Sequence, residues 1–163
     1  MKTVFLGIGT NLGEREENLR KAITLIGEHI GIITRVSSVY ETEPWGFKSE
    51  TTFLNIVVIA ETKLTPSGLL GRILMIEAMM GRLREGKVYK SRVIDIDILF
   101  FGNRIFENKV LTIPHPKIQD RRFVLVPLSE IAGDLEHPVF KKSIQELLEK
   151  CKDKSEVLKR DII

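Results

Sequence analysis

The stretch Val93-Ile94-Asp95-Ile96-Asp97-Ile98-Leu99-Phe100-Phe101 is the most informative part of the sequence, because it is typical of a buried strand yet carries two charges. Apolar β-branched and aromatic residues favour strands. Successive side chains of a strand point to opposite faces, so the isoleucines would bury one face and Asp95 and Asp97 would share the other. A rise of about 3.3 Å per residue places the two aspartate Cα atoms roughly 6.6 Å apart.

Upstream, strand-forming and helix-forming segments alternate. Short apolar and β-branched runs predict strands over residues 4–8, 32–40 and 53–62. An acidic first turn and apolar residues at helical spacing predict a helix over residues 14–30, and Thr-Pro predicts the start of another over 65–80. With the strand above, the order strand, helix, strand, strand, helix, strand favours a ferredoxin-like α+β sandwich, an antiparallel sheet with helices packed on it.

The C-terminal part is predicted to add helices to this core. Prolines between residues 114 and 128 indicate an irregular segment. Ser143-Ile144-Gln145-Glu146 is a capping box, which predicts the start of a helix. The charged end beyond Cys151 is expected to pack along one side, and we expect one domain over residues 1–163.

Composition excludes several classes of protein. With 163 residues, 43% of them hydrophobic and 29% charged, the chain is typical of one globular domain. The net charge of +3 is too small to indicate a nucleic-acid partner. One cysteine allows no internal disulfide, and the apolar N-terminal run is too short for a signal peptide or a membrane span, so we expect a cytoplasmic protein.

Asp95 and Asp97 are the candidate metal ligands. Two carboxylates on one face of an apolar strand are costly to bury without cations, water or hydrogen bonds. An edge strand with a solvated face would explain them as well. Burial of the opposite face by isoleucines favours a cleft and a shared magnesium site.

Basic residues crowd the segment just before this strand. Arg82, Arg84, Lys87, Lys90 and Arg92 fall within eleven residues that hold one acidic residue. A solvated basic loop is the common explanation, but cations beside a metal site favour phosphate chemistry. The same segment fits the phosphate-loop motif until Val88 replaces its final Ser or Thr, so we take that match as chance.

His115 stands between two prolines, with Arg121 close behind it in sequence. With Arg122, they could form a second cationic patch that reaches a nucleotide, or the histidine could be structural; both interpretations stay open. His29 and His137 have no partner at ligand spacing, so zinc is not expected.

These residues give the sequence a resemblance to the 6-hydroxymethyl-7,8-dihydropterin pyrophosphokinases of folate synthesis. It is carried, in order, by Gly7-Ile8-Gly9-Thr10-Asn11-Leu12-Gly13, Glu41-Thr42-Glu43-Pro44-Trp45-Gly46, Phe53-Leu54-Asn55, Arg92-Val93-Ile94-Asp95-Ile96-Asp97 and Pro114-His115-Pro116. The resemblance implies transfer of the β,γ-diphosphate of ATP to the pterin hydroxymethyl oxygen, with release of AMP. It also implies a ferredoxin-like fold, two Mg²⁺ ions, and no obligate protein partner, nucleic acid or membrane.

The resemblance further implies a role for each matching residue. Asp95 and Asp97 would bind magnesium, with Arg82 and Arg92 as catalytic cations. The nucleotide contacts would be Glu77, Arg84, Arg92, Ile98, Thr112, His115 and Arg121. The pterin contacts would be Thr42, Pro44, Trp45, Phe53, Asn55 and Phe123, since two aromatic rings can sandwich a flat heterocycle and an amide can bind its polar edge.

Two other functions are weighed against this one. The same order of elements builds the common RNA-recognition fold, but the aromatic RNA-binding motif of that fold is missing and paired aspartates would repel a phosphate backbone. A phosphate-loop NTPase would need the motif to join a strand to a following helix, whereas here it would leave a helix and enter a strand.

Overall fold

The strand β1 (Lys2–Thr10) runs through the middle of the sheet in this computed structural model, whose described residues are 1–43, 51–81 and 93–161. It pairs antiparallel with β4 (Phe53–Thr62) on one side and with β5 (Asp95–Phe101) on the other. Its apolar residues alternate between two faces that are both covered, so the strand is buried along most of its length.

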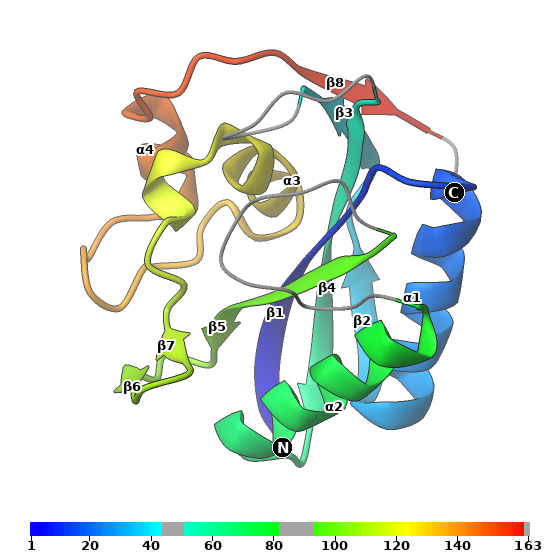
Figure 1. The fold of residues 1–163 in the computed structure, drawn as a ribbon. Coiled ribbons are helices and arrows are strands. Elements are labelled where there is room, and N and C mark those ends of the chain that lie inside the picture. The colour runs from blue at the N-terminus through cyan, green and yellow to red at the C-terminus, as the bar shows by residue number, and fades with distance from the viewer. Residues whose placement is uncertain (44–50, 82–92, 162–163) are drawn as a thin grey trace.

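The remaining strands extend the sheet beyond β4. Both β2 (Gly31–Val36) and β3 (Val39–Thr42) pair antiparallel with β4, and β8 (Val157–Arg160) pairs with β3. The order is therefore β5-β1-β4-β3-β8, with β2 also on β4 (Figure 1). This antiparallel sheet with helices packed on it confirms the predicted α+β class.

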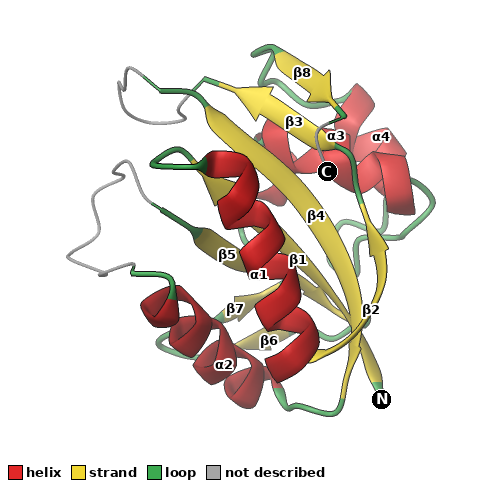
Figure 2. Cartoon of the chain, turned by 90° about the vertical axis from the view of Figure 1, so that its right-hand side faces the viewer, coloured by secondary structure: helices red, strands yellow, loops and turns green. Residues whose placement is uncertain are grey.

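Helices cover both faces of the sheet. On one face lie α1 (Arg15–His29) and α2 (Pro66–Met79) (Figure 2). Their apolar residues share one core cluster with the β1 side chains of Val4, Leu6 and Ile8. On the other lie α3 (Arg122–Ala132) and α4 (Ile144–Glu149), packed on Phe5 and its neighbours. The predicted caps are confirmed: Thr65 accepts from Gly68 N, and Ser143 forms the capping box with Glu146.

The prediction of one strand over residues 32–40 is wrong, because the strand is interrupted between β2 and β3. Ser37 N donates to Val57 O, and the Ser37 hydroxyl accepts from Val57 N, each at 2.9 Å. The backbone N–H and the hydroxyl of Ser38 both bond to the Glu130 carboxylate. Serine side chains thus replace part of the β ladder at this point.

The prediction of an irregular segment over residues 114–128 is also wrong in its second half. That half contains a 3₁₀ turn, η1 (Ile118–Asp120), and the start of α3, which holds Pro127 inside it. A proline there removes one backbone donor, and burial of the helix's apolar side offsets that loss. The charged C-terminal end does more than pack along one side, since it forms β8.

Two short strands, β6 (Phe106–Glu107) and β7 (Thr112–Ile113), form a separate hairpin beside β5. Across the described parts of the chain, no helix is both long and apolar enough to cross a membrane.

Candidate functional site

The register of the three central strands brings distant residues into two rows across the sheet. Asp95 of β5 lies opposite Gly9 of β1, which lies opposite Asn55 of β4. One step further along, Asp97, Gly7 and Val57 form the next row. Both rows belong to the face on which α3 packs. Since α3 covers the end near Val57, the end near Asn55 is left open.

Glycines keep this open end hollow. A Cβ added to Gly9 would lie 3.2 Å from Asn55 Oδ1 and 3.6 Å from the Phe53 ring. A side chain at this position would therefore crowd Asn55 Oδ1 and fill the space beside the Phe53 ring. The strand predicted over residues 4–8 continues to Thr10 in β1, and Gly7 and Gly9 form the floor of a cleft.

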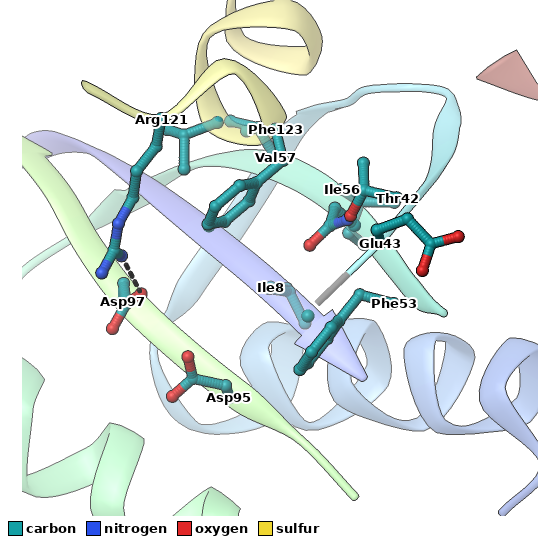
Figure 3. Close-up of a pocket in the computed structure, with 14 residues that line it drawn as sticks. Ile8, Thr42, Glu43, Phe53, Ile56, Val57, Asp95, Asp97, Arg121 and Phe123 are labelled. Carbon is teal, nitrogen blue, oxygen red and sulfur yellow. Dashed lines mark hydrogen bonds and ion pairs between the residues drawn. The ribbon is translucent and has the colours of Figure 1, made fainter. Parts of the chain in front are cut away.

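The first cleft lies above this floor and, together with the solvent at its open mouth, has a volume of about 620 Å³. Figure 3 shows the rings of Phe53 and Phe123 on opposite sides of it, with Asp95, Asp97 and Arg121 toward one end. Its described lining consists of Gly7, Ile8, Gly9, Thr42, Glu43, Phe53, Asn55, Ile56, Val57, Asp95, Asp97, Arg121, Phe123 and Val124. The structure thus brings together four of the six residues expected at the pterin: Thr42, Phe53, Asn55 and Phe123.

Asn55 has a fixed orientation in the first cleft. Its Nδ2 donates to Thr42 Oγ1 at 2.8 Å, and both side chains are 6% exposed. The bond uses the donor end of the amide, so the Oδ1 acceptor faces the region beside Gly9. A flat ligand between the phenylalanine rings would meet this acceptor at its polar edge.

Asp95 and Asp97 lie at the end of the first cleft, as the strand period predicts. The isoleucines at positions 94, 96 and 98 are at most 5% exposed, so the opposite face of β5 is buried. Arg121 Nη1 lies 4.0 Å from Asp97 Oδ2, and the Arg121 guanidinium also lies over the Phe123 ring. A buried cation therefore stands between the aromatic wall and the carboxylates.

A second cleft of about 780 Å³ lies on the other side of Asp97. It contains three of the residues expected at the nucleotide, which are Ile98, Thr112 and His115. The remaining described lining is Leu70, Ile96, Asn108, Lys109, Val110, Leu111 and Pro116. Asp97 lines both clefts, so a ligand in one would lie next to a ligand in the other.

His115 is not part of a cationic patch. Burial, with the nearby charge of Arg121, lowers its pKa from 6.5 to about 4, although Asp95 acts in the opposite direction. The ring is therefore neutral at pH 7. Its Nδ1 accepts a hydrogen bond from Lys117 N at 3.1 Å, which assigns the proton to Nε2. His115 can thus offer one neutral donor.

Glu77 lies beneath the strand that carries the two aspartates. It is 2% exposed on α2, and its Oε2 accepts from Ile96 N at 2.9 Å. Ile96 stands between the two aspartates, and its N–H lies on the edge of β5 that does not face β1. Glu77 therefore supports β5, and its predicted nucleotide contact stays a prediction.

Several predicted site residues lie outside the described residues. These are Pro44 and Trp45 for the pterin and Arg82, Arg84 and Arg92 for the phosphates. Their roles stay predictions.

The donor set fits magnesium better than a fully protein-bound metal. Within residues 1–43, 51–81 and 93–161, no three His, Cys, Asp or Glu side chains gather at a possible metal site. Magnesium is commonly held by one or two carboxylates together with substrate phosphates and water. Asp95 and Asp97 supply two carboxylates at the junction of the clefts, so they fit such an ion.

Sequence reasoning missed several lining residues. Gly7 and Gly9 contribute space rather than a functional group, and their role depends on the register with β4 and β5. Lys109 adds a cation to the second cleft from the β6–β7 hairpin, a connection whose path the local sequence does not give. Glu43 could have been noticed as the neighbour of Thr42.

The chain is similar to a known enzyme family. Residues 5–133 match the family described as 7,8-dihydro-6-hydroxymethylpterin-pyrophosphokinase (HPPK). The 2-amino-4-hydroxy-6-hydroxymethyldihydropteridine pyrophosphokinase of Aquifex aeolicus is 40% identical over 146 residues, 90% of either chain. The protein of the same name from Bacillus subtilis is 41% identical over 133 residues, 81% of this chain and 79% of that one.

Solved structures support the fold independently. The crystal structure of wild-type Plasmodium falciparum HPPK-DHPS superposes with a TM-score of 0.73 at 20% identity. It covers 92% of this chain, and this chain spans 43% of that one. At this identity the likeness establishes the fold alone.

Proposed function

The chain belongs to the 7,8-dihydro-6-hydroxymethylpterin-pyrophosphokinase family, and we propose that it transfers the β,γ-diphosphate of ATP to the hydroxyl of 6-hydroxymethyl-7,8-dihydropterin in folate synthesis. The observation that carries the proposal is the position of Asp97, which lines both clefts. A two-substrate transfer needs its acceptor and donor side by side. Two clefts that meet at a carboxylate pair supply that arrangement.

The first cleft binds the pterin in this proposal. Phe53 and Phe123 stack on the two faces of the ring, and Asn55 Oδ1 accepts from its polar edge, with Thr42 holding the amide in place. The hydroxymethyl group then points toward the aspartates. Pro44 and Trp45 complete the pocket, as the resemblance implies.

The second cleft binds ATP in this proposal. His115 donates from Nε2 to a nucleotide oxygen, while Ile98 and Thr112 line the same space. Arg121 faces the transferred group from its position beside Asp97. Arg82, Arg84 and Arg92 complete the set of cations, again from the resemblance.

Asp95 and Asp97 hold magnesium, with two ions expected per ATP. When bound, the metal neutralises charge on the phosphate oxygens and orients the transferred group. Arg121 restrains Asp97 and keeps a positive charge close to that group. Positioning by these residues supplies most of the rate.

The atoms of the reaction balance with ATP and the pterin as the only reactants. The hydroxymethyl oxygen attacks the β-phosphorus, the bond from that phosphorus to the α,β-bridging oxygen breaks, and AMP leaves with that oxygen. The hydroxyl proton is released. A product containing the β- and γ-phosphates forms on the pterin.

Product analysis tests the proposed function. The protein is mixed with magnesium, ATP and 6-hydroxymethyl-7,8-dihydropterin, and nucleotides are separated by chromatography. AMP should form in the complete mixture and be absent when the pterin or the magnesium is omitted. ADP as the product, or no AMP from folded protein, would overturn the proposal.

Asp97→Ala tests the metal role. We expect loss of turnover with the fold kept, because the partly exposed side chain contributes little to the core. Asp134→Ala, at an exposed aspartate outside both clefts, is the matched control and should keep full activity. Activity of Asp97→Ala within tenfold of the parent would contradict the assignment.

We also propose that the enzyme works in the cytoplasm without an obligate protein partner. The single cysteine, Cys151, is buried and forms no disulfide within the chain, which suits a reducing compartment.

A further inference from the structure

The C-terminal segment Asp153–Arg160 follows the range 5–133 that matches the family, and none of its residues lines either cleft. It nevertheless contacts the two elements that carry the walls of the first cleft. One is α3, which presents Phe123 from its first turn, and the other is β3, which ends at Thr42. Figure 1 shows the segment passing from α4 to β8, which lies beside β3.

At its first end the segment caps α3. The N-cap residue of this helix is Arg121, whose side chain makes no capping bond. Asp153 Oδ2 accepts instead from Arg122 N at 3.1 Å, and Arg122 Nε donates to Ser155 O at 3.2 Å. Asp153 Oδ1 accepts from Ser155 N at 3.0 Å, which holds the carboxylate in position. A carboxylate that is distant in sequence thus accepts the hydrogen bond that an N-cap side chain would normally accept.

The capping carboxylate is ionised at neutral pH. Burial raises the pKa of Asp153, but hydrogen bonds from Ser155 and from Arg122 N, with the Arg122 charge, lower it more. The capped residue, Arg122, stands between Arg121 and Phe123, which both line the first cleft. The cap therefore acts on the turn that aims these two side chains.

At its second end the segment holds β3. Val157 pairs with Thr42 and Leu158 with Glu41, so the strand ladder reaches the last residue of β3. Arg160 forms an ion pair with Glu41. Glu41 also accepts from Arg15 at 3.2 Å, so β3 is tied at the same point to the start of α1.

We propose that Asp153–Arg160 is a strap that fixes the two walls of the pterin cleft relative to each other, with Asp153 as a positioning residue. The inference rests on the proposed function, since it assigns the first cleft to the pterin. The core does not depend on the strap, because α3 is buried on the sheet through Val124, Leu125 and Leu128. Cutting the strap should therefore loosen the cleft without unfolding the protein.

Kinetics of four variants test the strap. Asp153→Ala and a chain that stops after Glu156 should each raise the KM for the pterin about tenfold, with kcat and the KM for ATP within about twofold of the parent. Asp153→Asn keeps one carbonyl acceptor and should show a smaller rise. Lys154→Ala, at an exposed neighbour, is the control and should match the parent.

A double variant, with Asp153→Ala in the chain that stops after Glu156, distinguishes a strap from two independent local effects. Once β8 is removed, the Asp153 cap no longer links α3 to β3, so Asp153→Ala should add little to the KM of the shortened chain. The proposal would be overturned if the two changes multiplied each other's effect on the pterin KM, or if the pterin KM did not change. It would also be overturned if kcat fell and the KM values for both substrates rose by the same factor. Asp153→Asn keeps the test valid if Asp153→Ala does not fold.

Direct binding distinguishes this proposal from the proposed function. The dissociation constant of 6-hydroxymethyl-7,8-dihydropterin is measured by calorimetry for the parent and each variant, with a non-hydrolysable ATP analogue present. No AMP from the parent enzyme would reject the proposed function. Normal AMP formation with equal pterin affinity in all variants would reject the strap alone.

Discussion

Thr10→Val should weaken magnesium use by the enzyme, although Thr10 touches neither cleft. Thr10 ends β1, is fully buried, and its hydroxyl donates to Val93 O. The same hydroxyl accepts from Asn18 Nδ2 at 3.2 Å, and Asn18 Nδ2 also lies 3.4 Å from Val93 O. Val93 comes two residues before Asp95, so these bonds fix the chain just ahead of the carboxylate pair.

The size of the effect follows from the lost bonds. Valine has nearly the shape of threonine, so the substitution removes the hydroxyl without opening a cavity. A buried carbonyl that loses its donor costs about 1–3 kcal/mol, and the remaining Asn18 contact limits the loss to about 1–2 kcal/mol. For a chain of this length, that lowers the melting temperature by about 2–8 °C. If all of it opposes metal binding, the magnesium required for half-maximal activity rises by at most about 5- to 30-fold.

Thr10→Ser is the matched control. It keeps both hydrogen bonds but removes a buried methyl group, at a cost of about 1 kcal/mol. Both variants are therefore destabilised by similar amounts. Urea unfolding gives their stabilities, and AMP formation at increasing magnesium gives their metal requirement. The reasoning fails if serine and valine shift the magnesium requirement equally, or if valine leaves it unchanged.

Two further outcomes are expected. Gly9→Ala should raise the pterin KM more than the ATP KM, because the new Cβ would crowd Asn55 Oδ1 in the first cleft; steady-state kinetics with each substrate varied checks this. Burial raises the pKa of Glu130, but hydrogen bonds from Ser38 and Tyr40, with Lys159 nearby, lower it more. Glu130 therefore stabilises the fold above its unfolded pKa, and this contribution is lost as pH falls through the folded value. The excess unfolding free energy of the parent over Glu130→Gln should shrink between pH 7 and pH 3.5 in urea titrations.

Local sequence patterns predicted the elements that local forces determine. The Ile-Val-Val-Ile run of β4 is buried on both faces, and the observed strand has the predicted limits, Phe53–Thr62. The helix α2 begins after Thr65 because the Thr65 side chain accepts a hydrogen bond from Gly68 N, and Pro66 has no N–H that would need an acceptor at the first helical position. In both cases the determining interactions lie within a few residues of each other.

Elements determined by distant partners were not predictable in this way. The strand is interrupted at Ser37 because Ser37 and Ser38 form hydrogen bonds with Val57 and Glu130, which are distant in the sequence. The last strand, β8, is mostly exposed and charged, so its conformation depends on pairing with β3. The start of α3 depends on Asp153, a cap that no local pattern around Arg121 indicates.

The candidate site follows the same division. The strand period alone placed Asp95 and Asp97 on one face, and the resemblance supplied Phe53, Asn55 and Phe123. Neither could show that Glu77 supports β5 through Ile96 N, because this bond joins α2 to a strand that only the fold brings beside it. The neutral state of His115 likewise depends on burial that only the fold reveals.

The location of the site has a physical cause in the way α3 meets the sheet. Val124, Leu125 and Leu128 bury one half of the sheet face, while Phe123, at the start of the helix, overhangs the other half. Glycines in β1 prevent that half from filling with side chains. All described residues that line the two clefts lie between Gly7 and Val124, inside the range that matches the family. The segment after α3 can therefore influence catalysis only through the elements it contacts, which is why its contacts with α3 and β3 are the ones to test.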